Sequence, residues 1–145
     1  EEIENELNLS DNGNKIKNKI KLNKTKKREL LSFDYKGFQI FVGRNNKENE
    51  EISFSKGQPN DIWMHIKDIP GSHVLILRNN QELPEDVLIY AANLACEYSK
   101  AKKGDKVTVD YCERKFIKKI KNSKPGNVTY TNFHSLLINV PEKSL

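Results

Sequence analysis

Residues 84–113 decide the fold class, and they read PEDVLIYAANLACEYSKAKKGDKVTVDYCE. Their first part repeats apolar side chains at three- and four-residue spacing, which is the period of a helix with one buried face. Pro84 suits the first turn of a helix, and Gly104 suits the position after its end. The spacing therefore predicts a helix over 84–102. The residues that follow alternate between apolar and polar, which predicts a strand over 106–113.

Upstream of the helix, the sequence predicts a β-hairpin. Two apolar runs, at 30–35 and 38–42, flank the dipeptide Lys36-Gly37. A two-residue connection that contains Gly is typical of a tight hairpin turn, because Gly accepts a positive φ. We expect the two runs to pair as antiparallel strands.

A second pair of strands is predicted at 61–68 and 72–78, joined at Pro70-Gly71. Pro followed by Gly suits the two central positions of a type II turn. Such a turn would place Asp68 opposite His73 and leave His65 on the other face of the hairpin.

Two more strands are predicted at 128–131 and 135–140, and Asn45 or Asn46 can cap a short helix that ends near residue 51. Together these elements predict an α+β fold, with a largely antiparallel sheet of about seven short strands, one long helix and one short helix.

Charge divides the 145-residue chain into two parts. The whole sequence has 25 bases and 20 acids, a net charge of +5. Residues 1–28 hold eight of those bases and five of those acids, which leaves 17 bases and 15 acids in 29–145. Residues 1–9 carry a helical apolar stripe, and the Lys/Asn-rich run after them is typical of a linker or mobile arm. We expect one folded domain at 29–145 in a piece of a longer protein.

Neither the cysteines nor the hydropathy indicate an exported or membrane protein. Two cysteines without a CxxC spacing indicate neither a disulfide framework nor a zinc site, and they suit a reducing, cytoplasmic compartment. No stretch approaches the roughly 18 apolar residues of a membrane span, and no signal peptide opens the chain.

Enzyme signatures are absent, because the sequence has no GxGxxG, Walker-type loop, GxSxG or HExxH. A hydrolase or nuclease would have to use Asp61, Asp68 and His73. The Asp of an Asp-x-Pro-Gly sequence more often caps the turn, and the His beside it only forms a hydrogen bond. We therefore expect no enzyme, no cofactor and no metal site.

Basic residues indicate nucleic acid as a partner. Six bases and no acid lie within 114–124, next to Pro125-Gly126, which predicts a flexible loop. Its lysines can contact phosphates, although a loop that is merely solvated has the same composition. Arg44-Asn45-Asn46 adds a guanidinium and two amides at a strand-to-helix junction, where a capped turn is the alternative. Four aromatic residues can stack on bases where they are exposed, although strand aromatics are more often core: Tyr35, Phe41, Trp63 and Phe133.

Three segments resemble a known family. GFQIFVGRNN at 37–46 with Asn49, PNDIWMH at 59–65 with KDIPGSHV at 67–74, and KPG at 124–126 with VTYTN at 128–132 are similar to the NFACT-R domain. That domain occurs in NFACT proteins, which include the fibronectin-binding-protein-A-like proteins and the nuclear export mediator factor. The resemblance covers roughly residues 30–141. The sequence departs from the family at Met64, where relatives often have an aromatic residue, and over 113–121, which is poorer in Pro and Gly.

The resemblance implies a role in ribosome-associated quality control. NFACT proteins bind a stalled large ribosomal subunit and tRNA, and they support C-terminal tailing of the nascent chain. The partners expected for the full-length protein are thus the large subunit and tRNA, with no membrane and no small-molecule substrate. Residues 1–28 would be the end of a coiled-coil helix plus a linker.

The residues expected to contact nucleic acid come from this resemblance and from the basic run: Arg44, Asn45, Asn46, Asn49, His65, Lys67, Asp68, Ser72, His73, Arg114, Lys115, Lys118, Lys119, Lys121 and Lys124. Residues that match the family pattern beside these are Trp63, Pro70 and Gly71. The alternative function is an adhesin-like module that binds fibronectin or fibrinogen, which the family's older name suggests.

Overall fold

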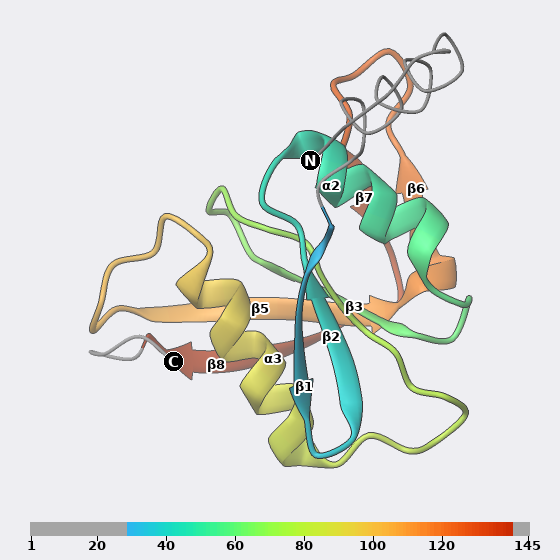
Figure 1. Cartoon of the computed structure of the whole chain (residues 1–145). Coiled ribbons are helices and arrows are strands. Elements are labelled where there is room, and N and C mark those ends of the chain that lie inside the picture. Colours follow the sequence, from blue (N-terminus) through green and yellow to red (C-terminus); the bar gives the residue numbers. More distant parts are fainter. Residues whose placement is uncertain (1–28, 141–145) are drawn as a thin grey trace, which may run out of the picture.

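The computed structural model describes residues 29–140, and the predictions for residues 1–28 lie outside this range. The described chain forms the antiparallel α+β fold that the sequence predicts (Figure 1). The element bounds are β1 (Leu31–Tyr35), β2 (Phe38–Val42), α2 (Asn46–Glu51), η1 (Ile52–Lys56, a π-helix), β3 (Ile62–Ile66), β4 (Val74–Ile76), α3 (Glu85–Glu97), β5 (Lys106–Glu113), η2 (Arg114–Phe116, a 3₁₀ turn), β6 (Ile117–Lys119), β7 (Val128–Tyr130) and β8 (His134–Asn139).

Six strands form one sheet in the order β1-β2-β4-β3-β5-β8, and every neighbouring pair is antiparallel. The remaining strands, β6 and β7, form a separate two-stranded ribbon. The described residues thus contain eight strands, in agreement with the prediction of about seven. The additional strand is β6, which lies in the basic run that was predicted to be a loop.

The β1–β2 hairpin confirms its prediction. Tyr35 pairs with Phe38, so Lys36 and Gly37 are the only residues of the turn. Both have positive φ, 51° and 86°, as the tight turn of a two-residue hairpin requires.

The β3–β4 pairing differs from its prediction. Met64 pairs with Val74, whereas a turn centred on Pro70-Gly71 would put Leu75 opposite Ile66. Pro70 and Gly71 do not make the turn, because they pair with the chain after α3. Gly71 forms an antiparallel bridge with Ser99, and the Pro70 carbonyl accepts a hydrogen bond from the Lys100 amide at 3.0 Å. Residues 67–73 are therefore a wide loop.

The same contact ends α3 early. The helix runs from Glu85 to Glu97 instead of to residue 102, because the next residues bond to the 67–73 loop. The Tyr98 carbonyl accepts the Ser72 amide hydrogen at 3.1 Å. Backbone groups that a longer helix would use internally join two distant segments instead.

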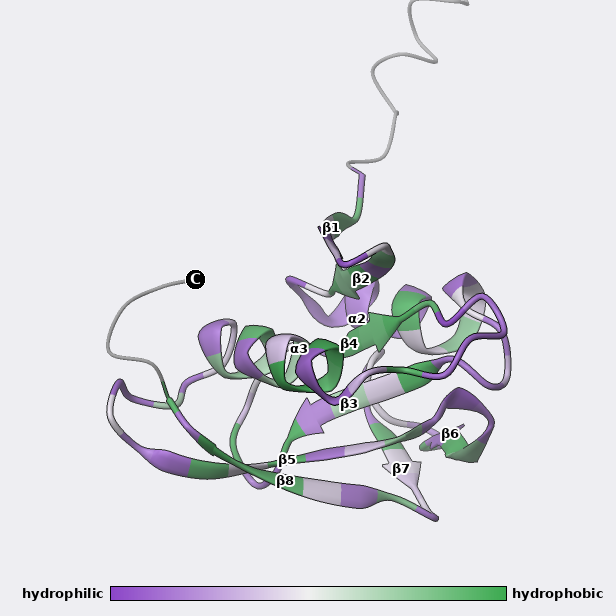
Figure 2. Cartoon of the chain, turned by 90° about the horizontal axis from the view of Figure 1, so that it is seen from below, coloured by the Kyte–Doolittle hydropathy of each residue, from purple (hydrophilic) through white to green (hydrophobic). Residues whose placement is uncertain are grey.

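Two cores form on the two faces of the sheet. On one face, Met64 and Val74 pack against α3 with the larger cluster of buried apolar residues. On the other face, Trp63 and Leu75 pack with Ile52 of η1 and with residues of the ribbon. Figure 2 shows α3 across the sheet. The β6–β7 ribbon lies near the start of β3 and the end of β5, away from α3. This second face carries the site described next.

Candidate nucleic-acid interface

A cavity of about 600 Å³ opens on the second face of the sheet. Its walls come from α2, from β3 with the loop that follows it, and from the β6–β7 ribbon. Such a volume is typical of sites for small ligands or for single groups of larger ones. Six of the residues predicted to bind nucleic acid line it: Asn46, Asn49, His65, Lys67, Asp68 and His73.

The cavity brings together two histidines that the predicted hairpin placed on opposite faces. The His65 and His73 rings lie nearly perpendicular, with centroids 5.4 Å apart. The observed register explains the difference: Met64 pairs with Val74, and the residues next to this pair, His65 and His73, therefore project to the same face. An odd shift in register moves a side chain to the other face of a strand.

His73 is buried in a network of side-chain hydrogen bonds. Its Nδ1 lies 2.7 Å from Ser53 Oγ, which also accepts the indole N–H of Trp63 at 3.0 Å. The His73 amide donates to Asn49 Oδ1 at 3.0 Å. Burial, aided by the neighbouring His65, lowers the pKa of His73 to about 3, so its imidazole is neutral at pH 7.

The pKa of His65 is also lowered, chiefly by burial. The two imidazoles in the cavity are therefore both uncharged near pH 7. They offer flat rings and nitrogen donors or acceptors rather than positive charge.

Aromatic rings continue the wall from the histidines toward solvent. The Trp63 ring stacks at 6.1 Å from His65 and tilts against Tyr130 at 5.0 Å. Tyr130 in turn meets Phe133 edge to face at 5.2 Å. Phe133 is 42% exposed. Of the four aromatic residues proposed for stacking, Trp63 and Phe133 thus line the cavity, whereas Tyr35 stacks on Tyr90 and Phe41 belongs to the core.

Asp110 lies buried in this wall with both carboxylate oxygens bonded. It accepts the hydroxyl hydrogens of Tyr130 and Ser135, each at 2.7 Å. The pKa of Tyr130 is raised, chiefly by burial and secondly by the hydrogen bond to Asp110. Asp110 was not among the predicted site residues, because one acid in an alternating strand carries no distinguishing pattern. Tyr130 could have been selected from the sequence, since it lies in the third segment that resembles the family.

The basic run forms β6 and part of the loop before β7, and two of its lysines are paired. Lys119 Nζ bonds Glu50 of α2 at 2.8 Å, and Lys115 lies 3.4 Å from Glu113. Arg114 donates to the Ser53 carbonyl at 3.0 Å, so it holds η1 in place. Within residues 29–140, three lysines of the run make no ion pair: Lys118, Lys121 and Lys124.

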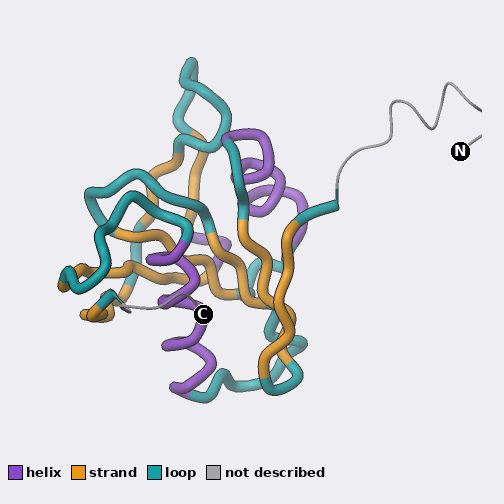
Figure 3. The backbone as a smooth tube through the Cα atoms, turned by 60° about the vertical axis from the view of Figure 1, so that its left-hand side comes forward, coloured by secondary structure: helices purple, strands orange, loops and turns teal. Residues whose placement is uncertain are grey.

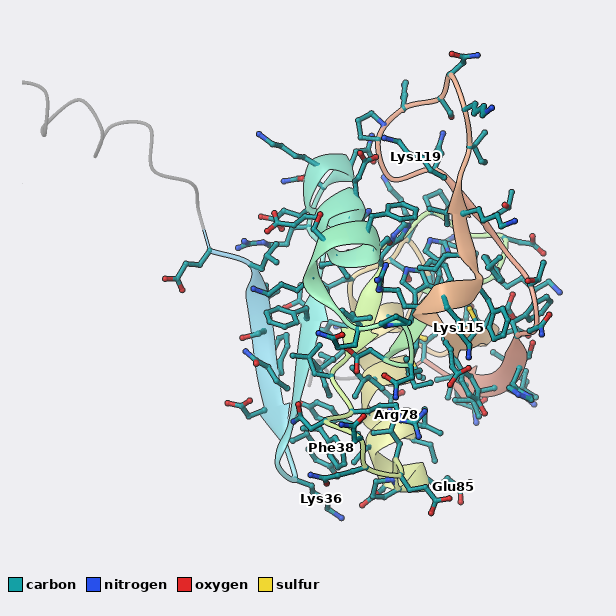
Figure 4. All side chains as sticks on the ribbon, turned by 90° about the vertical axis from the view of Figure 1, so that its right-hand side faces the viewer. Lys36, Phe38, Arg78, Glu85, Lys115 and Lys119 are labelled. Atoms are coloured by element: carbon teal, nitrogen blue, oxygen red, sulfur yellow. The ribbon has the colours of Figure 1, made fainter. Side chains whose placement is uncertain are left out.

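The loop between β6 and β7 stands out from the body of the domain (Figure 3). Figure 4 shows Lys119 on this ribbon beside α2, while Lys36 lies at the opposite end of the molecule. The ribbon and its connecting loop thus carry three cations that have no ion-pair partner among the described residues. The same segment also lines the cavity, through Ile120 and Tyr130 among others.

Three other predicted residues lie outside the cavity wall. Arg44 pairs with Glu48 at 2.8 Å, and Asn45 caps α2 by accepting the Glu48 amide hydrogen at 2.8 Å. Ser72 is buried beside the end of α3. The structure gives these residues positions that hold α2 and the 67–73 loop.

Of the three residues considered for catalysis, Asp68 and His73 line the cavity, whereas Asp61 does not. Asp61 is buried and accepts backbone hydrogens of Gln58 and Arg78 at 2.7 and 2.8 Å, away from the cavity. Cys96 and Cys112 are buried, and burial raises the pKa of each thiol to about 11. The described part of the chain has no group of three residues suited to hold a metal ion. It also has no helix long and apolar enough to cross a membrane.

Comparison with known proteins identifies the family. Residues 30–132 match the family described as the NFACT protein RNA binding domain. The chain belongs to this family. The match confirms the resemblance carried by the three sequence segments. It includes the ribbon and every residue that lines the cavity except Phe133.

Relatives of the NFACT domain agree with this assignment. The chain is 42% identical over 102 residues to the Rqc2 homolog RqcH of Bacillus subtilis, which covers 70% of this chain and 18% of the relative. It is 40% identical over 126 residues to the protein of that name in Streptococcus pneumoniae, covering 86% and 22%. The chain therefore spans about a fifth of the length of these relatives.

A solved structure shares the fold. It is described as the C-terminal of the fibronectin/fibrinogen-binding protein from Streptococcus suis, and it superposes with a TM-score of 0.74 at 37% identity. The match covers 81% of this chain and 48% of that one.

Proposed function

We propose that residues 29–140 form a non-enzymatic RNA-contacting module. The observation that carries this proposal is the ribbon with its connecting loop. Among residues 29–140, Lys118, Lys121 and Lys124 of this segment have no ion-pair partner, and the segment lies beside an aromatic cavity. The description of the family as an RNA binding domain supports the same function.

The charges of the ribbon explain how contact would occur. A lysine that neutralises a phosphate releases counterions, so the binding constant falls as salt rises. Lys119 is already held by Glu50 at 2.8 Å and contributes less to such contacts. The three unpaired lysines are therefore the residues that set the salt dependence.

A salt series tests this assignment. We expect the chain to bind a fluorescein-labelled single-stranded RNA, with an affinity that falls linearly on a log–log plot against salt. Replacing Lys118, Lys121 and Lys124 with Gln should reduce the slope by about 2, at roughly 0.7 per phosphate contact on a single strand. An unchanged slope would contradict the role of these lysines.

A second triple variant is the matched control. Lys102, Lys103 and Lys106 are exposed and lie at the other end of β5 from the ribbon. Replacing them with Gln changes the net charge equally. Because they are remote from the ribbon, the slope of this variant should stay close to that of the original chain.

We propose further that the full-length protein acts in ribosome-associated quality control in the cytoplasm. Its partners would be the stalled large ribosomal subunit and tRNA, and it would support C-terminal tailing. The matches to RqcH relatives support this proposal. Co-sedimentation tests it: the chain should pellet with isolated large subunits, and the variant of Lys118, Lys121 and Lys124 should pellet less. Absence of the chain from the pellet at low salt would contradict a ribosomal contact by this domain.

Fibronectin or fibrinogen binding is a second candidate function, because the similar Streptococcus suis structure comes from a fibronectin/fibrinogen-binding protein. This function predicts that the chain binds immobilised fibronectin or fibrinogen, and that excess RNA does not displace it. Failure to bind either protein, together with salt-dependent RNA binding, would rule out the adhesin function for this domain.

A further inference from the structure

We propose that the cavity binds a single unpaired base of RNA, while the ribbon lysines hold the phosphates beside it. This inference rests on the proposed function, since it names the part of the RNA that the domain takes. It follows from three features of the cavity: its rings, its lack of internal positive charge, and one buried amide without a partner.

Rings supply the first argument. Phe133 is 42% exposed, yet it packs edge to face on Tyr130 at 5.2 Å and lines the cavity. Tyr130 is held by its bond to Asp110, and His65 extends the aromatic surface inward. Proteins that bind unpaired bases stack them on aromatic side chains held in this way.

Charge supplies the second argument. His65 and His73 are neutral near pH 7, and both oxygens of Asp110 are occupied by hydroxyl groups. A phosphate inside the cavity would meet no cation and a buried carboxylate. Lys67 is exposed at the rim, and the unpaired lysines lie on the ribbon. The arrangement suits a neutral flat group inside and phosphates outside.

Asn49 supplies the third argument. Its side chain lines the cavity and is 8% exposed, and its Oδ1 accepts the His73 amide hydrogen. Among the described residues, its side-chain NH₂ has no hydrogen-bond partner. A buried donor without a partner is costly, so an acceptor from a bound group is expected there. The edge of a base supplies carbonyl oxygens and ring nitrogens of this kind.

Comparison of two oligomers tests the proposal. One is an eight-nucleotide single-stranded RNA, and the other has the same length but abasic units throughout. Both offer phosphates to the lysines, whereas only the first offers bases. We expect the abasic oligomer to bind about fivefold more weakly or worse at equal salt. Trp63 is the only tryptophan of the chain and lines the cavity. Its fluorescence should therefore change when the RNA binds and stay the same when the abasic oligomer binds.

A matched pair of variants assigns the effect to the cavity. Phe133→Ala removes an exposed ring from the cavity wall, and Leu137→Ala removes a side chain that is 67% exposed on β8 and outside the cavity. Phe133→Ala should weaken binding of the RNA about fivefold or more and leave binding of the abasic oligomer unchanged. Leu137→Ala should change neither.

The outcomes separate this proposal from the proposed function. Equal binding of the two oligomers, or RNA binding unaffected by Phe133→Ala, would overturn the base site and leave the phosphate contacts standing. Equal binding of a fully paired RNA duplex would also overturn it. If neither oligomer binds at low salt, the RNA-contacting function itself is contradicted.

Discussion

Ser53 links two residues of the cavity wall, because its hydroxyl group bonds both Trp63 and His73. We expect Ser53→Ala to lower the free energy of unfolding by about 1–3 kcal/mol, since it leaves buried polar groups without partners. Urea denaturation measures this change. Ser55→Ala is the matched control, because Ser55 belongs to the same π-helix and is exposed. Equal losses in both variants would contradict the role of the buried hydroxyl.

The neutral state of His73 predicts how stability depends on pH. Its pKa is about 3 when folded and near 6.5 when unfolded, so between these values the unfolded chain binds more protons. Its contribution to stability is therefore present above pH 6.5 and is lost as pH falls. In His73→Gln, the loss of unfolding free energy between pH 7 and 5 should shrink by about 2 kcal/mol. Equal losses in the two proteins would show that His73 titrates normally.

Several of the residues that the resemblance selected do line the cavity, but their contacts could not be predicted. Asn49, His65 and His73 belong to the matching segments and meet at one site. Ser53 lies 20 positions before His73 and has no pattern that links the two. Such contacts depend on strand register and helix placement, which local sequence does not fix.

Among the elements, the β6–β7 ribbon and its loop are bonded to α2 through the side chain of Glu50. Glu50 accepts the Gly126 amide hydrogen at 3.1 Å and the Lys119 ammonium group at 2.8 Å, and these bonds lower its pKa. Glu50→Gln should therefore loosen the ribbon. We expect severalfold faster amide hydrogen exchange at Ile120 and Thr131, whose amides close the ribbon.

The control for this variant is Glu82→Gln, an exposed substitution in the loop before α3. It should leave exchange in the ribbon unchanged. Ribbon exchange that is equally slow in Glu50→Gln would show that β6 and β7 hold their position without α2.

Elements with strong local signals were predicted well, and those set by distant contacts were not. The β1–β2 hairpin and β5 were predicted within one residue. Pro70-Gly71 favours a type II turn locally, yet its backbone pairs with the chain after α3. β6 was missed because lysines hide its alternation, while Ile117 packs into the second core.

At the scale of the whole molecule, the two faces of the sheet differ in structure and in the charges they carry. The face with α3 is closed by the larger core, while the opposite face carries the cavity and the lysine ribbon. The domain as a whole has only a small excess of bases over acids, 17 to 15 in residues 29–145. Attraction to RNA must therefore come from where the cations lie rather than from net charge.

The most direct test of RNA contact is an NMR titration of the ¹⁵N-labelled 145-residue chain with single-stranded RNA. We predict that the amide signals that shift belong to the β6–β7 ribbon and to the cavity wall around His65 and Asn127. Signals of exposed residues on α3, such as Ile89, should stay in place. Shifts confined to α3, or no shifts at low salt, would contradict RNA contact through the ribbon and the cavity.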